Sequence, residues 1–104
     1  KATKVRFPLG IFVFAELFTH TTHIQTKNER ELVTRQSFEA FLALLKIEPR
    51  FYQCNRGIVI NLEHAVDFDG EVFVMDDGNQ IPVSQKLVKH ARQTFMEFLF
   101  QRGH

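Results

Sequence analysis

The chain has 104 residues, a length typical of one domain and too short for two. Hydrophobic residues make up 44% of it and include twelve phenylalanines, so a packed core is expected and global disorder is excluded. The formal net charge of +1 is, taken alone, weak support for nucleic-acid binding. No apolar run reaches the roughly 18 residues of a membrane-spanning helix, because the run at 11–18 already contains Glu16.

The start of the chain is basic but lacks an initiator Met and the apolar region of a secretory signal. We therefore expect residues 1–8 to be a lead-in from a missing upstream segment and residues 9–104 to form the domain. Cys54 is the only cysteine, which excludes an internal disulfide and favours a cytoplasmic location. Its aromatic and β-branched neighbours predict a buried thiol. The histidines show no metal-site spacing with Cys54, so no metal or other cofactor is expected.

Strand patterns dominate the first third of the chain. Residues 4–17 predict a short strand, interrupted at Pro8 and Gly10, and then a longer buried one. Residues 19–26 predict a polar loop followed by a half-exposed strand. Residues 27–34 predict a turn at Lys27–Asn28 and another strand, so that a hairpin is the simplest connection.

The pattern then changes to a helical period. Ser37 is suited to cap a helix, and apolar residues follow it at i, i+3, i+4 and i+7, namely Phe38, Phe41, Leu42 and Leu45. Pro49 cannot continue a helix. A short amphipathic helix is therefore expected over residues 37–46, with its apolar stripe packed on a sheet.

Strand signals return at residues 58–62, 65–68, 71–75 and 80–83. The last two flank residues 76–79, an acidic turn with a glycine that predicts a hairpin. Pro82 cannot donate to a strand ladder, so its strand is expected to lie at a sheet edge or to end there. Ser84 is suited to cap a final helix over residues 84–99.

Charge is unevenly distributed along the second half. Six acidic residues and no Lys or Arg lie between Glu63 and Asp77, and Lys86, Lys89 and Arg92 follow at spacing three. This pattern fits a domain with an acidic and a basic side, since polyanions respond to the local field. It also fits two ordinary solvated faces.

Three segments, in this order and spacing, resemble the LytTR family of bacterial DNA-binding domains, the output domains of response regulators. They are "FVFAELFTHTTHIQT", "SFEAFLALLKIEPRFYQCNRGIVINLEHAVDF" and "GNQIPVSQKLVKHARQTF". The resemblance spans roughly residues 9–98. It implies a mainly β fold, an elongated stack of antiparallel sheets with short helices, that places loops in successive major grooves of DNA.

Carried over position by position, the resemblance implies contacts from three places. They are His20, Thr22 and His23 in the first loop, Asn55 and Arg56 at a strand entry, and Gln85 and Lys86 before the last helix. Independently of the resemblance, lysines such as Lys86 and Lys89 are expected to add phosphate contacts that do not depend on sequence. The chemistry agrees, since Arg can pair with guanine and Asn or Gln with adenine. The structural alternative for each residue is an ordinary exposed polar position. Gly57 is expected to relieve a backbone constraint or to mark a bulge that turns Arg56 outward.

Three functions stay open at this point. The first is a sequence-specific DNA-binding module of a transcription regulator in a two-component system, which in the full-length protein is expected to bind repeated half-sites as a homodimer. The second is a protein-interaction or dimerisation module on the same scaffold, which the low net charge keeps open. The third is an enzyme that uses Cys54 with a histidine, which the apolar surroundings of the thiol disfavour. Neither a small-molecule substrate nor a membrane partner is expected.

Overall fold

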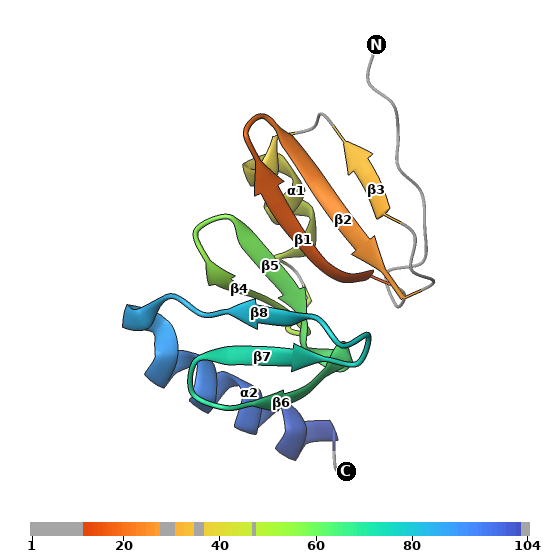
Figure 1. Cartoon of the computed structure of the whole chain (residues 1–104). Coiled ribbons are helices and arrows are strands. Elements are labelled where there is room, and N and C mark those ends of the chain that lie inside the picture. The colour runs from red at the N-terminus through yellow and green to blue at the C-terminus, as the bar shows by residue number, and fades with distance from the viewer. Residues whose placement is uncertain (1–11, 28–30, 35–36, 47, 103–104) are drawn as a thin grey trace.

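The computed structural model describes residues 12–27, 31–34, 37–46 and 48–102, and strands dominate this part of the chain (Figure 1). In chain order the elements are β1 (Phe12–Phe18), β2 (Thr21–Thr26), β3 (Glu31–Thr34), α1 (Phe38–Leu45), β4 (Phe51–Asn55), β5 (Ile58–Asn61), the 3₁₀ helix η2 (Leu62–His64), β6 (Ala65–Phe68), β7 (Val72–Met75), β8 (Gln80–Pro82), the 3₁₀ helix η3 (Gln85–Leu87) and α2 (Val88–Arg102). The expected mainly β fold with two helices is confirmed. Among the described residues, no helix is long and apolar enough to cross a membrane.

The strands form two antiparallel sheets that lie one above the other in Figure 1. The larger sheet has the order β3-β2-β1-β5-β4, and the smaller has the order β6-β7-β8. The domain is elongated, with extents of 42 × 29 × 26 Å. The expected stack of antiparallel sheets is therefore confirmed.

Two apolar clusters hold these layers together. One lies between α1 and the larger sheet and contains Phe12 and Phe41. The other joins β4 and β5 to the smaller sheet and α2, and it contains Cys54, Phe73 and Phe95. Phe73 meets Phe95 edge to face, with ring centroids 5.5 Å apart. Because full burial of such a side chain stabilises a fold by roughly 1.5–3 kcal/mol, these contacts fix α2 against the smaller sheet.

The first helix begins where its capping residue predicts. The Ser37 side chain accepts a hydrogen bond of 3.1 Å from the backbone N of Ala40, which satisfies one of the free N–H groups of the first turn. Phe38, Phe41 and Leu45 form the buried face, at helical spacing. The helix expected over residues 37–46 is thus confirmed.

The second helix starts and ends later than predicted. The side chain of Ser84 makes no capping bond, and the Leu87 N–H donates to the Ser84 carbonyl at 2.8 Å to close the tight turn of η3. The Ser84 N–H donates to the carbonyl of Cys54 at 2.9 Å, which fastens this residue to β4. The α-helix follows η3 and runs to Arg102. The α-helix is therefore preceded by one turn of 3₁₀ helix, for which Ser84 is the N-cap residue.

A hairpin of β4 and β5 is a finding that the sequence pattern does not predict, because it indicates a strand only from Ile58. The turn at Arg56–Gly57 joins the two strands. The Gly57 carbonyl accepts from the Leu17 N–H at 2.8 Å, and a Cβ added to Gly57 would lie 3.3 Å from the Leu17 Cβ. Gly57 thus permits close approach to β1. The irregularity in the ladder lies between Gln53 and Asn55, at Cys54, so the bulge is inside β4, three residues before Gly57, where it was expected.

The remaining predicted hairpins are present. β2 and β3 pair antiparallel, with Ile24 opposite Leu32. β7 and β8 pair around the turn of residues 76–79, and β8, which contains Pro82, is an edge strand. The lead-in at 1–8, the short strand expected before Pro8 and part of the turn at Lys27–Asn28 lie outside the described residues.

Candidate nucleic-acid interface

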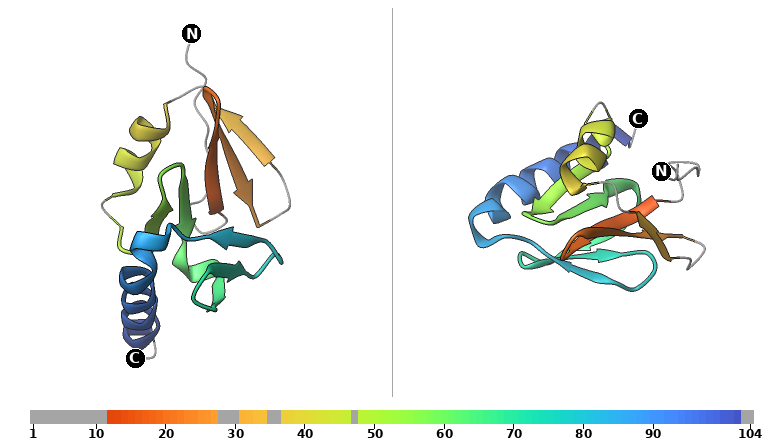
Figure 2. Two further views of the ribbon diagram at one scale, coloured as in Figure 1. Left: turned by 60° about the vertical axis from the view of Figure 1, so that its left-hand side comes forward. Right: turned by 90° about the horizontal axis from the view of Figure 1, so that it is seen from above.

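The three segments that the sequence singles out meet along one edge of the molecule. They are the β1–β2 turn, the β4–β5 turn and the β8–α2 segment, which includes η3. The bond from Leu17 N to the Gly57 carbonyl (2.8 Å) links the first two, and the bond from Ser84 N to the Cys54 carbonyl (2.9 Å) links the last two. They lie along the left-hand edge of Figure 1, and they follow one another from top to bottom in the left view of Figure 2. We call this edge the loop edge.

The β1–β2 turn is short and strained. Phe18 pairs with Thr21, so only Thr19 and His20 form the loop. Thr19 has φ 53°, a left-handed conformation that a β-branched residue adopts only when its surroundings impose it. The Thr21 hydroxyl donates to the Phe18 carbonyl at 3.1 Å and braces the turn. His20 is consequently held at the exposed tip of this hairpin.

Thr22 and His23 do not lie in this loop, because strand β2 begins at Thr21. Thr22 is completely buried, with 0% of its surface exposed, which argues against the expected contact with DNA. Strand alternation turns its side chain inward. His23 is half-buried and both its ring nitrogens have partners, Thr21 Oγ1 and Glu31 Oε2, each at 3.1 Å. Of these three residues, His20 is therefore the one that this hairpin exposes at the loop edge.

The β4–β5 turn presents Arg56. The Gln53 side-chain amide donates to the Arg56 carbonyl at 3.0 Å, and Asn55 Oδ1 accepts from the Arg56 N–H at 2.8 Å. These two bonds fix the backbone of the turn. The exposed guanidinium of Arg56 has no hydrogen bond or ion pair with the rest of the described chain. It is therefore available for an external anion or base.

The β8–α2 segment carries two further exposed cations, Lys86 and Lys89, and the exposed amide of Gln85. In the described part of the chain none of these side chains has an ion pair. Arg92 follows along the same helix, and its guanidinium lies 5.3 Å from the centre of the Phe68 ring. Lys86, Lys89 and Arg92 are all exposed, as expected.

A groove between α1 and the β4–β5 hairpin adds a cation that the sequence does not reveal. Its lining residues are Phe38, Glu39, Leu42, Ala43, Lys46, Gln53 and Arg56. Lys46, the C-cap of α1, thus shares a groove with Arg56. No local pattern predicts this, because the packing of α1 on the sheet brings the two residues together.

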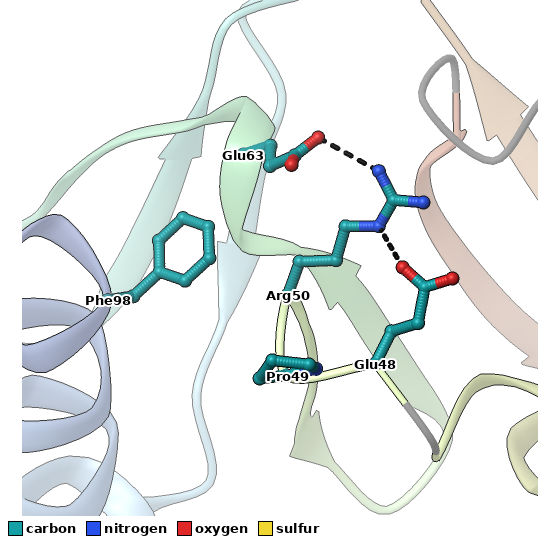
Figure 3. A pocket seen from close by; sticks show the side chains of 5 residues that line it. All are labelled: Glu48, Pro49, Arg50, Glu63 and Phe98. Atoms are coloured by element: carbon teal, nitrogen blue, oxygen red, sulfur yellow. Dashed lines mark hydrogen bonds and ion pairs between the residues drawn. The ribbon is translucent and has the colours of Figure 1, made fainter. Parts of the chain in front are cut away.

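A second hollow lies beside α2 and has a different character (Figure 3). Arg50 contacts Glu48 through Nε at 2.7 Å and Glu63 through an outer nitrogen at 3.1 Å. Phe98 forms its other wall. Two carboxylates outweigh one guanidinium here, so this hollow is unsuited to a polyanion.

The acidic run occupies two ends of the smaller sheet. The β7–β8 turn lies at the end away from the loop edge, and its Asp76 contacts His64 at 2.7 Å. The β6–β7 turn lies beside the β8–α2 segment, since the Val83 N–H donates to the Glu71 carbonyl at 3.0 Å. In that turn the backbone N–H groups of Val72 and Glu71 hold the pKa of the Asp69 carboxyl below its usual range. Hence only part of the acidic run lies away from the loop edge, and the β6–β7 turn adjoins its lower end.

The comparisons with known proteins agree with this geometry. The family model of the LytTr DNA-binding domain matches residues 7–96. A solved LytTr DNA-binding domain of a response regulator from Bacillus cereus shares the fold with a TM-score of 0.72, at 23% sequence identity, over 86% of this chain and 85% of that chain. No curated protein matches the chain. The family match extends over most of the chain and includes all three segments of the loop edge, and this chain belongs to the LytTR family of DNA-binding domains.

Proposed function

We propose that this domain binds double-stranded DNA sequence-specifically through the loop edge, as the output module of a bacterial transcription regulator. The observation that carries the proposal is the convergence of three polar turns, tied by backbone hydrogen bonds, on one edge whose cations have no ion-pair partner among the described residues. His20, Arg56 and Gln85 are suited to reach base edges in the major groove. Lys86, Lys89 and the newly found Lys46 are suited to contact phosphates.

The size of the molecule supports contacts in successive grooves. Its longest extent is 42 Å, and one turn of B-DNA is about 34–36 Å long. The three turns succeed one another along the molecule, so different turns can reach different grooves (Figure 2). One domain offers few base contacts, which favours a homodimer on repeated half-sites in the full-length regulator. Such a regulator acts in the cytoplasm.

The test is the substitution Arg56→Ala. We expect a loss of about 1–3 kcal/mol in binding to the preferred duplex and relaxed preference at the base pair that Arg56 reads. The melting temperature should hardly change, because the guanidinium has no protein partner in the described chain. Fluorescence anisotropy with a duplex selected by the domain from a random pool measures the affinity, and thermal unfolding measures the stability.

The matched control is Arg102→Ala, which removes an exposed guanidinium from the far end of α2, where it lies 5.5 Å from the Phe98 ring centre. This variant should bind DNA like the parent. Lys86→Ala should weaken binding to all sequences alike and reduce the slope of log affinity against log salt by about one. Intact DNA binding by Arg56→Ala together with a large loss of stability would reverse the assignment of Arg56.

A further inference from the structure

Asn55 stands between two of the three segments of the loop edge and bonds to both. It is the last residue of β4, and its Oδ1 accepts from the Arg56 N–H at 2.8 Å. Its Nδ2 donates to the carbonyl of Pro82, at the end of β8, at 3.5 Å. One side chain therefore joins the turn that presents Arg56 to the segment that presents Gln85 and Lys86.

Other hydrogen bonds beside Asn55 also join β4 of the larger sheet to the end of β8 in the smaller sheet. We call this line of contacts the seam between the two sheets. The Ser84 N–H donates to the Cys54 carbonyl at 2.9 Å, and the Cys54 thiol donates to the Pro82 carbonyl at 3.7 Å. Among these contacts the one from Ser84 to Cys54 is purely backbone and is available to any residue at position 54. Asn55 adds a side-chain bond that depends on its identity.

The chemistry of the amide fixes its orientation. A backbone N–H can only donate and a carbonyl can only accept, so Oδ1 must face Arg56 and Nδ2 must face Pro82. Bidentate recognition of adenine needs Oδ1 and Nδ2 of the same amide together. At Asn55 one lone pair of Oδ1 and one N–H of Nδ2 already bond to the protein, so the orientation of the amide is set by the two segments that it joins.

We infer that Asn55 is a positioning residue and not a reader of bases: it sets the spacing between the β4–β5 turn and the β8–α2 segment on DNA. This inference rests on the proposed function, and it replaces the direct contact that the family resemblance implies for Asn55. A fixed spacing matters because each turn must meet its own base pairs at the same time.

The first test needs no DNA. Backbone hydrogen exchange by NMR should show that Asn55→Ala accelerates exchange of the Arg56 and Ser84 amides about fivefold or more, the effect of one lost hydrogen bond. Asn55→Asp keeps an acceptor for Arg56 but cannot donate to Pro82 when ionised, so it should accelerate exchange at Ser84 alone. The control Asn79→Ala removes an amide that bonds to Asp77 at 2.9 Å in the β7–β8 turn, and should leave both amides unchanged.

The second test is the base preference of Asn55→Ala, measured by selection from a random duplex pool. A positioning residue should weaken preference at the base pairs read from both segments, whereas a direct reader should lose it at one base pair. Loss at one base pair, or unchanged exchange at Arg56 and Ser84, would overturn the inference. Absence of DNA binding by the parent would refute the proposed function instead, while the exchange experiment would still report on the seam.

Discussion

Cys54 is a thiol with no access to solvent, and this burial governs its chemistry. Its exposed fraction is 0%, and desolvation raises its pKa from the ordinary 9.0 to about 12. The buried thiol that the sequence predicts is therefore confirmed. A nucleophilic or redox cysteine needs a thiolate that reagents can reach, so these properties argue against enzymatic use of Cys54.

The raised pKa predicts a loss of stability in alkali. Below pH 9 the thiol is protonated in both folded and unfolded chains, and Cys54 contributes its full stability. Between about pH 9 and pH 12 the unfolded chain releases the proton more readily, so the free energy of unfolding should fall. The pKa of Tyr52 is also raised, by burial and then by the Cys54 charge, and this adds to the fall above pH 10.

Urea denaturation at a series of pH values measures this effect, with Cys54→Val as the control whose curve should be flatter above pH 9. A maleimide reagent near neutral pH should label the parent only after unfolding. Rapid labelling of the native protein, or identical pH profiles for the two proteins, would contradict the account of Cys54.

For single residues, the sequence predicts exposure correctly in some cases and not in others. The exposed positions of Arg56, Lys86 and Lys89 follow from their charge, because water solvates long cationic side chains. The exposure expected for Thr22 is not found, because the direction of its side chain depends on where the preceding turn ends. That turn closes after two residues with Thr19 at a positive φ, which a sequence with a β-branched residue there does not suggest.

Two serines at helix starts give a matched comparison at the scale of elements. Ser37 caps α1 through its side chain, whereas the Ser84 side chain makes no capping bond and its backbone N–H binds β4. Ser37→Ala should therefore lower the free energy of unfolding by about 1 kcal/mol. Ser84→Ala should change it by less than about 0.5 kcal/mol.

Urea denaturation of both variants and the parent checks this prediction. Equal losses from the two substitutions would show that Ser84 stabilises its helix by a route other than its backbone bond to Cys54.

Elements that local sequence signals specify can be predicted from the sequence. Elements that depend on pairing with a distant strand cannot. The α1 helix has a cap and an apolar stripe within ten residues, and its extent agrees with the prediction. β4 has five residues that end in polar Asn55, and its identity as a strand comes from pairing with β5. The α-helix α2 starts after the 3₁₀ turn η3, and Ser84 before that turn bonds to Cys54, thirty positions earlier in the chain.

At the scale of the molecule, the net charge of +1 is a poor guide to the field at the loop edge. Among the described residues, Arg50 is paired with carboxylates, whereas Arg56, Lys86 and Lys89 have no such partners. The acidic β6–β7 turn adjoins one end of the loop edge. Since like charges repel, this turn is expected to limit how far DNA extends along that end.

The loop edge itself follows from sheet topology. β1 lies next to β5, so that the β1–β2 and β4–β5 turns share one end of the larger sheet. This strand order joins residues about forty positions apart, so it cannot be predicted from composition or periodicity. The family resemblance supplied the order of the segments, and the structure shows the bonds that hold them together.

The most direct test of the loop edge is an NMR titration of the backbone amides with a duplex selected by the domain. We predict that residues 19–20, 55–57 and 84–89 shift together as DNA is added, and that the β7–β8 turn and the last turn of α2 do not. Shifts confined to the exposed apolar side of α2 around Met96 and Phe100, with the three turns unaffected, would contradict the account.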